Sequence, residues 1–229
     1  MSHLDYLDFD VSFNSLGVNG DGKKGSVKNG QNIGRVPVTE DLARFLGLYL
    51  AEGCPTSDGM CFTFNNNEEE YIEFICRMSK LLFGRNPSVT TRHSTNVKIN
   101  IRSLGKLFAG WFGKKARKKR IPSFVFDWSL MHKIRFMYGY LEGDGSFPKN
   151  GCFNFRTSST KVADGIIRLA ATCGMVAKKT RVESSTSIYQ GNVIQSGPAW
   201  QGWFAKKSSG KMADLLSSVR DGSYLRIPV

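Results

Sequence analysis

The sequence predicts an α+β fold made of two similar halves, each with the order helix, two strands, helix, two strands, helix. Two observations predict it: two helical segments share the same spacing of small residues, and similar elements follow each of them in the same order, 92 residues apart. Apolar residues make up 41% of the 229 residues and charged residues 22%, which is enough apolar material for a buried core. We therefore expect two αββαββα halves.

The elements of the two halves follow from hydrophobic periodicity and from turn residues between the periodic segments. In the first half they are expected at 40–52 (helix), 61–64 (strand), 68–83 (helix), 89–93 and 97–102 (strands), and from 103 (helix). In the second half they are expected at 129–144 (helix), 152–155 (strand), 161–173 (helix), 176–183 and 200–207 (strands), and from 208 (helix). An Arg-Ile-Pro tripeptide closes each half, at 120–122 and 226–228.

Composition divides the chain into four segments. Residues 1–34 form a glycine-rich arm, with one short strand at 9–13, because this stretch has no periodicity. Residues 35–113 form the first half and 128–229 the second. Between them, the linker 114–127 begins with six cations in seven residues, a run that is usually a solvated linker but on a basic chain suits phosphate.

The charge favours a polyanionic partner. The 32 Lys and Arg against 19 Asp and Glu give a net charge of +13, and the isoelectric point is about 9.7. A positive field of this size concentrates nucleic acid, although many soluble proteins are also basic.

Several other classes of protein are excluded or disfavoured. No apolar run approaches the roughly 20 residues that span a bilayer, and the N-terminus lacks a signal-peptide pattern, so we expect an intracellular, non-secreted protein without a membrane partner. Five cysteines without a C-x-x-C pair argue against a disulfide framework and a cysteine zinc site. The three histidines lack metal-ligand spacing, and no phosphate-binding P-loop is present.

Each leading helix ends in a carboxylate that follows two small residues four positions apart. These small residues are Gly47 and Ala51 in one helix and Gly139 and Gly143 in the other. Small residues let helix backbones approach closely. If the helices pack in parallel along these stripes, Glu52 and Asp144 meet at one end.

Such a meeting is electrostatically unfavourable without a cation. Each carboxylate at the negative end of a helix dipole is disfavoured by roughly 0.3–1 kcal/mol, and the two repel each other. Mg²⁺ prefers carboxylate and carbonyl oxygens, so Glu52 and Asp144 with the carbonyls of Ala51 and Gly143 are the candidate metal ligands. A single Gly-Asp-Gly is usually an ordinary turn, but two matched endings on a basic chain favour a site for phosphodiester hydrolysis.

These residues resemble a known family. The segments Phe45-Leu-Gly-Leu-Tyr-Leu-Ala-Glu-Gly53 and Met137-Tyr-Gly-Tyr-Leu-Glu-Gly-Asp-Gly145 are similar to the two nine-residue signatures of the LAGLIDADG homing endonucleases. The second is the stronger match, and the first ends in Glu in place of Asp but keeps the carboxylate. The resemblance covers roughly residues 35–229 and leaves out the arm.

The resemblance implies a monomer whose halves are related by a pseudo-two-fold axis and packed through the two motif helices. Saddle-shaped antiparallel sheets would bind double-stranded DNA at a long asymmetric target site. Glu52 and Asp144 would be the catalytic acids and hold Mg²⁺, with Mn²⁺ or Ca²⁺ able to substitute for binding. Each strand would be cut across the minor groove to leave 3′ overhangs, and the gene would lie in an intron or intein.

Strand alternation selects the residues expected to contact DNA. In the strand expected at 97–102, Val, Ile and Ile point one way and Lys, Asn and Arg the other. For any one residue a solvated sheet face is the simpler interpretation, but the set favours DNA. The expected DNA-binding residues are Thr63, Asn65, Arg92, Lys98, Asn100, Arg102, Lys118, Lys119, Asn154, Arg156, Lys179, Arg181 and Lys207.

Two points stay open in the sequence. In the family a sheet lysine often assists near the metals, and Lys98 and Lys207 are the candidates. However, the best register of the halves pairs Arg102 with Lys207 and Trp203 with Lys98, so the halves disagree. The alternative to an endonuclease is a relative that binds nucleic acid without cleaving, as an RNA maturase or a DNA-binding regulator. A pure binder has no use for two acids that repel phosphate, which favours the enzyme.

Overall fold

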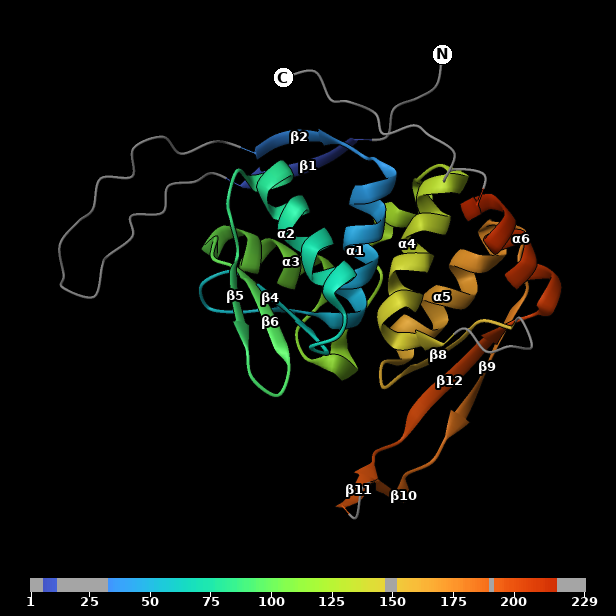
Figure 1. Cartoon of the computed structure of the whole chain (residues 1–229). Coiled ribbons are helices and arrows are strands. Elements are labelled where there is room, and N and C mark those ends of the chain that lie inside the picture. The colour runs from blue at the N-terminus through green and yellow to red at the C-terminus, as the bar shows by residue number, and fades with distance from the viewer. Residues whose placement is uncertain (1–5, 12–32, 147–151, 190–191, 218–229) are drawn as a thin grey trace.

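The computed structural model of the chain describes residues 6–11, 33–146, 152–189 and 192–217. These residues form two αββαββα halves that lie side by side, which confirms the expected fold (Figure 1). The first half contains α1 (Glu40–Glu52), β3 (Gly53–Pro55), β4 (Met60–Phe64), α2 (Glu69–Phe83), β5 (Ser88–Thr91), β6 (Thr95–Ile99) and α3 (Arg102–Phe112). The second contains α4 (Leu130–Asp144), β7 (Gly145–Ser146), β8 (Asn154–Thr157), α5 (Thr160–Thr172), β9 (Ala177–Val182), β12 (Ala199–Phe204) and α6 (Lys206–Ser217).

The two halves have the same sheet topology. Each half has a four-stranded antiparallel sheet, in the order β3-β4-β6-β5 and β7-β8-β12-β9. Gly53 pairs with Phe62 in the first sheet, and Gly145 pairs with Phe155 in the second. Because these pairs are equivalent, the sheets can be compared residue by residue.

Two expected strands end earlier than predicted. The strand expected to reach residue 102 ends at Ile99, and Arg102 is the first residue of α3. The amides of Leu104 and Gly105 both donate to the carbonyl of Ile101, which begins the helix. The alternating pattern of the strand therefore ends before Arg102, which belongs to the helical pattern of α3. In the second half, β12 ends at Phe204, so Lys207 lies in α6 rather than in a strand.

Two further pairs of strands extend the fold. Part of the expected arm forms β1 (Tyr6–Val11), which pairs with β2 (Ile33–Pro37) and buries Phe9 against Phe83 and Trp111. Strands β10 (Ser185–Tyr189) and β11 (Asn192–Ser196) form a hairpin beyond the ends of β9 and β12, which the sequence did not predict. The rest of the arm and the second Arg-Ile-Pro tripeptide lie outside the described residues.

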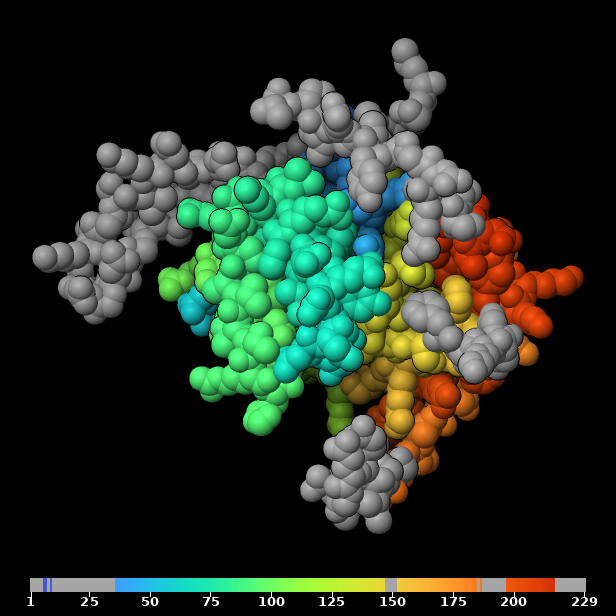
Figure 2. Space-filling model, viewed as in Figure 1, coloured from blue at the N-terminus to red at the C-terminus, as the bar shows by residue number. Residues whose placement is uncertain are grey.

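The motif helices α1 and α4 pack through their small residues, as predicted. A Cβ atom on Gly47 would lie 2.1 Å from the carbonyl oxygen of Phe136, and one on Gly139 would lie 2.3 Å from that of Arg44. A Cβ on Gly143 would lie 2.6 Å from the Cβ of Ala51. Residues later in α1 contact residues later in α4, so the two helices run parallel. In the space-filling view only a narrow strip of α1 is visible between α2 and α4 (Figure 2).

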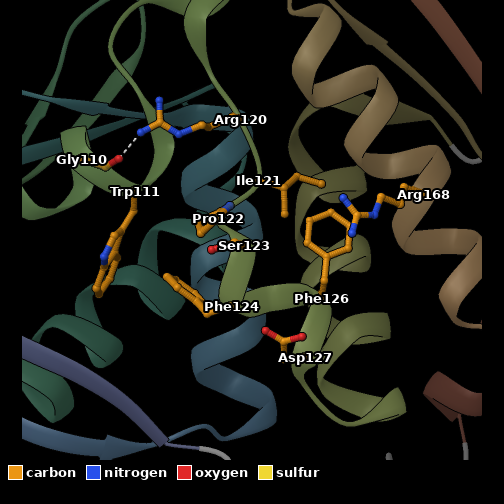
Figure 3. A pocket seen from close by; sticks show the side chains of 10 residues that line it. All are labelled: Gly110, Trp111, Arg120, Ile121, Pro122, Ser123, Phe124, Phe126, Asp127 and Arg168. Carbon is orange, nitrogen blue, oxygen red and sulfur yellow. Dashed lines mark hydrogen bonds between the residues drawn. The ribbon is translucent and has the colours of Figure 1, made fainter.

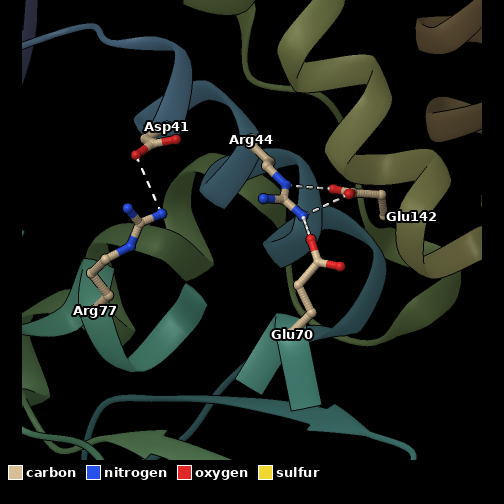
Figure 4. A network of polar contacts seen from close by, with 5 residues as sticks. All are labelled: Asp41, Arg44, Glu70, Arg77 and Glu142. Carbon is tan, nitrogen blue, oxygen red and sulfur yellow. Dashed lines mark hydrogen bonds and ion pairs between the residues drawn. The ribbon is translucent and has the colours of Figure 1, made fainter. Parts of the chain in front are cut away.

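Ion pairs also connect α1 with α4 at the polar edge of their interface (Figure 4). Arg44 on α1 binds both carboxylate oxygens of Glu142 on α4, at 2.7 Å each, and also reaches Glu70 at 3.2 Å. Glu40 on α1 accepts a 2.6 Å bond from Arg135 on α4. Glu142 is only 4% exposed, and its bidentate geometry is the strong form of a carboxylate–guanidinium contact.

The linker between the halves is bonded to both of them. It contains the short helices η1 (Ala116–Lys118) and η2 (Ser123–Asp127). The amide of Arg120 donates to the carbonyl of Phe112 at 2.8 Å, and the hydroxyl of Ser159, the N-cap of α5, donates to the carbonyl of Lys119 at 2.6 Å. The linker therefore has a defined path across the molecule.

A cavity of about 580 Å³ lies between this linker, α3 and α5 (Figure 3). Its lining includes Trp111, Phe124 and Phe126, and Arg168 stacks over the ring of Phe126. Neither Glu52 nor Asp144 lines it. None of the described helices is long and apolar enough to cross a lipid bilayer.

Candidate active site

The two predicted acids meet where the motif helices end. Glu52 is the last residue of α1 and Asp144 the last of α4. The Oε1 atom of Glu52 lies 3.0 Å from the point that a Cβ on Gly143 would occupy, directly beside Asp144. Because Gly143 has no side chain, the Glu52 carboxylate can lie against the end of α4, next to Asp144.

Burial disfavours the ionised form of both carboxylates and so raises their pKa values. Burial raises the pKa of Glu52 to about 7, and the neighbouring Asp144 charge adds to this rise while Lys119 opposes it. Burial also raises the pKa of Asp144 to about 6, against the opposing effects of Lys119 and the Tyr140 hydroxyl. Two buried acids with raised pKa values at one point make this place a candidate functional site.

A lysine from the linker occupies this position. The Nζ atom of Lys119 donates hydrogen bonds to the carbonyl oxygens of Leu50 and Ala51, at 2.7 and 2.6 Å. Burial lowers the pKa of Lys119, and the charges of Asp144 and Glu52 oppose that fall. The Ala51 carbonyl is one of the predicted metal ligands, so the Lys119 ammonium group and a metal ion would compete for this oxygen.

A tyrosine hydroxyl lies against the same site. Tyr140, on α4, is fully buried beside Asp144, and its hydroxyl has no hydrogen-bond partner of good geometry among the described residues. Burial raises its pKa well above the ordinary value, and the charge of Asp144 adds to the rise. The hydroxyl therefore remains protonated and can donate to the Asp144 carboxylate after a small shift.

Among the described residues, no group of three or more His, Cys, Asp and Glu side chains gathers at one point. The ligands that the chain offers at the helix ends are therefore two carboxylates and main-chain carbonyls. All are oxygen atoms, which are the ligands that Mg²⁺, Mn²⁺ and Ca²⁺ accept. The residues present fit a hard divalent cation.

Several predicted DNA contacts lie on the sheet faces that the helices leave open. In the first sheet, Thr63 is opposite Asn96, and Lys98 is opposite Cys61 and Ser88. In the second, Arg156 and Asn154 are opposite Gln201 and Trp203. The inward neighbours Phe62, Val97, Phe155 and Phe204 are buried. The alternation of the strands therefore separates core from open face as the sequence predicts.

Lys179 and Arg181 do not lie on the open face of their sheet. Lys179 is opposite the buried Gly202, pairs with Asp164 on α5 and lies 4.0 Å from the centre of the Trp200 ring. Arg181, two residues further and so on the same side, pairs with Glu183 at 3.2 Å. The tripeptides Thr90-Thr-Arg92 and Lys179-Thr-Arg181 are similar in sequence and would match Thr90 with Lys179, whereas the sheets match Val89 with Lys179. A slip of one residue moves every side chain of a strand to the other face, so Lys178 and Thr180 point outward instead.

Five predicted DNA-binding residues lie outside regular strands or at their ends. Arg92 is in the β5–β6 turn, Asn65 follows β4, and Asn100 follows β6 with its amide donating to the Ser88 hydroxyl at 3.1 Å. Arg102 and Lys207 are exposed in the first turns of α3 and α6. Their symmetric positions confirm the register that pairs Arg102 with Lys207 and Trp203 with Lys98. Since Trp203 replaces a lysine, Lys98 has no symmetric partner.

The sequence predicted Lys119 only as a DNA contact. Lys119 is the cation that opposes the pKa rise of both acids, whereas neither Lys98 nor Lys207 affects either of them in this way. Lys118 beside it is exposed. The only signal in the sequence was the run of six cations. The helical turn η1 and the hydrogen bond from the Ser159 hydroxyl to the Lys119 carbonyl set which of the six side chains points toward the acids.

One prediction concerns stability without metal. Because the folded-state pKa of Glu52 (about 7) lies above its ordinary value of 4.5, folding favours the protonated form, and this contribution to stability is lost as pH rises from about 4.5 to 7. In EDTA, Glu52→Gln should therefore raise the free energy of unfolding relative to wild type by about 1–3 kcal/mol at pH 8 and by much less at pH 5. Urea denaturation at both pH values measures this difference.

The control for this prediction is the double variant Glu52→Gln/Asp144→Asn. It leaves the buried Lys119 ammonium with carbonyl partners but without a counter-charge, so it should gain less than Glu52→Gln alone. An equal gain from Glu52→Gln at pH 5 and pH 8 would contradict the raised pKa.

Known proteins resemble this chain in sequence over part of its length. It is 26% identical over 156 residues to a DNA polymerase of Thermococcus sp. (strain GE8), covering 65% of this chain and 9% of that protein. It is 29% identical over 154 residues to the ATP-dependent DNA helicase Hel308 of Thermococcus kodakarensis, covering 61% of this chain and 13% of that protein. The chain thus spans about a tenth of the length of these relatives. It matches no protein-family model.

The fold itself is found in a homing endonuclease. A variant of I-DmoI, solved in complex with nicked target DNA in the presence of manganese, superimposes with a TM-score of 0.56 at 11% identity, covering 82% of this chain and 99% of that chain. With its two glycine-packed helices that end in acids, the chain therefore has the two-motif LAGLIDADG fold of the homing endonucleases.

Proposed function

We propose that this protein is a site-specific endonuclease that hydrolyses both strands of double-stranded DNA with a divalent metal ion, for which Mg²⁺ is the natural candidate. The observation that carries the proposal is the meeting of Glu52 and Asp144 at the ends of two parallel helices, with pKa values of about 7 and 6. A protein that only bound DNA would gain nothing from two buried acids that face phosphate.

The proposed metal ligands are Glu52, Asp144 and the carbonyl oxygens of Ala51 and Gly143. When bound there, the metal would supply charge stabilisation for in-line attack on a phosphodiester. The two carboxylates come from different halves, so the site is complete only when α1 and α4 are packed. We therefore expect activity to depend on the glycine contacts between the helices.

Lys119 has a positioning and charge-stabilising role in this proposal. In the metal-free protein its ammonium group donates to the carbonyl oxygens of Leu50 and Ala51. With the acids and carbonyls holding a metal ion, the Nζ atom of Lys119 would be available to donate to a phosphate oxygen on which negative charge develops. The bond between Ser159 and the Lys119 carbonyl keeps the backbone in place.

The open faces of the two sheets are the proposed DNA-binding surface. Thr63, Lys98, Asn154 and Arg156 lie on them, with Lys178 and Thr180 added by the corrected register. Arginine and asparagine suit the acceptor and donor patterns of guanine and adenine in the major groove. We expect target recognition from this surface and a strong salt dependence from the surrounding positive charge.

The sequence relatives support an origin as an inserted element. A polymerase and a helicase catalyse different reactions, yet both match this chain over about 150 residues that form about a tenth of each. A segment shared by proteins of different activity cannot carry the activity of either host. We therefore propose that the related segments are mobile elements of the intein kind.

The decisive experiment is cleavage of a large random duplex library by the full chain with Mg²⁺, followed by sequencing of the new ends. Recurrent ends with 3′ overhangs that are absent in EDTA support the proposal and identify the target site. A bound consensus without new ends would overturn cleavage and favour a non-cleaving DNA-binding regulator. If neither appears, binding to structured RNA would favour the maturase.

A second prediction separates Lys119 from its neighbour. Lys119→Met should lower the cleavage rate by roughly 10²–10³-fold, the usual cost of losing one donor that stabilises developing charge, with little change in DNA affinity. The matched control Lys118→Met removes an exposed cation one residue away, and should reduce only affinity and its salt dependence. Single-turnover cleavage at saturating enzyme distinguishes the two. Lys98→Met tests the alternative lysine: if it lost the rate and Lys119→Met did not, our assignment would be wrong.

A further inference from the structure

Two free cysteines face each other next to the acid pair. Cys54, in β3, is directly opposite Cys61, in β4, so the two side chains project from the same face of the strand pair. Cys54 is exposed, whereas Cys61 is 5% exposed. Cys54 follows Glu52 by two residues, so the pair lies at the start of the strand that continues the first motif helix.

The strand geometry suits a disulfide bond. Directly opposed residues of antiparallel strands have Cα atoms about 4.5–5.5 Å apart. Disulfides span Cα separations of about 4.4–6.8 Å, so these two cysteines can be joined without a large backbone movement. The eight-residue segment 54–61 that would be closed contains the turn between the two strands.

The pair lies on the open face of the sheet. Cys61 alternates with the buried Met60 and Phe62, and its other neighbour across the sheet is Lys98 on β6. In the second sheet the positions equivalent to Cys54 and Cys61 are Ser146 and Asn154. The fold therefore does not require thiols here, and the pair is a particular feature of the first half.

We propose that Cys54 and Cys61 form a redox-modification site, at which a small-molecule disulfide such as oxidised glutathione converts the two thiols into an intramolecular disulfide. The exposed Cys54 sulfur, as thiolate, attacks one sulfur of oxidised glutathione and forms a mixed disulfide, releasing one glutathione, which takes up the proton. The Cys61 sulfur then attacks the Cys54 sulfur, releasing the second glutathione. Two electrons and two protons pass from the protein to the oxidant.

The test is alkylation and intact mass measurement of the full chain after incubation with oxidised glutathione. Wild type should lose two alkylatable thiols, carry no glutathione, and recover both thiols with dithiothreitol. Cys61→Ser should keep one glutathione on Cys54, because the resolving thiol is missing, and Cys54→Ser should carry neither modification. The control Cys76→Ser, on α2, should behave as wild type. A lasting glutathione adduct on wild type, a disulfide to another cysteine, or five reactive thiols would overturn the proposal.

A second measurement links the cysteine pair to the proposed function. The expected result of this measurement rests on DNA binding by the open face of the sheet. If the open face binds DNA, random duplex DNA in EDTA at about ten times its dissociation constant should slow oxidation by roughly tenfold. Disulfide formation in the absence of DNA does not depend on whether the open face binds DNA. Oxidation that proceeds equally fast with bound DNA would therefore remove the open face from the DNA-binding surface and leave the redox site intact.

Discussion

Glu52→Gln and Asp144→Asn should each reduce double-strand cleavage by about 10³-fold or more. Each change keeps the size and hydrogen-bonding capacity of the side chain but removes one of the two negative charges of the proposed metal site. Metal ions contribute several kcal/mol of charge stabilisation to such reactions, and each 1.36 kcal/mol corresponds to a tenfold change in rate. Cleavage of the selected target, with nicks and double-strand breaks counted separately, measures the loss.

DNA binding provides the necessary contrast. The acids repel phosphate, so both variants should bind target DNA in EDTA at least as tightly as wild type. The matched control is Asp41→Asn, at the opposite end of α1, where the carboxylate makes an exposed ion pair with Arg77 at 3.5 Å. This change should leave cleavage unaltered. Full cleavage by either acid variant would refute the metal-site assignment.

Gly47→Ala should produce the largest loss of stability. The added Cβ would meet backbone, at 2.1 Å from the Phe136 carbonyl oxygen and 2.8 Å from the Tyr140 amide nitrogen, so the motif helices would have to separate. Overpacking of this kind costs about 1–3 kcal/mol and occasionally more, and contact with backbone leads us to expect about 3 kcal/mol or more. For a chain of this size the melting temperature should fall by roughly 6–12 °C.

Gly110→Ala is the matched control, because Gly110 also lies within a helix, α3, but a Cβ there would meet nothing within 4 Å. Relief of the glycine penalty should raise stability by about 0.5–1 kcal/mol. Thermal unfolding of both variants in EDTA measures the contrast. If Gly47→Ala proved as stable as wild type, the close approach of α1 and α4 would be wrong. Since Glu52 and Asp144 depend on that approach, a folded Gly47→Ala protein should also lose cleavage.

The order of elements, the small-residue stripes and the two acids were all predictable from the sequence. Each of these features is recorded in residues close to one another along the chain: spacing of four marks a helix face, and alternation marks a strand face. The repeat of both patterns at an offset of 92 residues made the pairing of Glu52 with Asp144 a reasonable expectation. The burial of Phe62, Val97 and Phe155 followed from the same alternation.

Only the tertiary structure decided which side chains reach the site. It selected Lys119 from six neighbouring cations, because a turn and a single bond to Ser159 direct this lysine toward the acids. It placed Lys179 on the side of its sheet that faces α5, because a one-residue slip between the halves exchanges the two faces of a strand. It also placed Cys54 opposite Cys61, because strand register sets which residues are opposite each other. Local periodicity determines the elements of this protein, whereas register and linker path, which depend on contacts between distant residues, determine the neighbours of its acids.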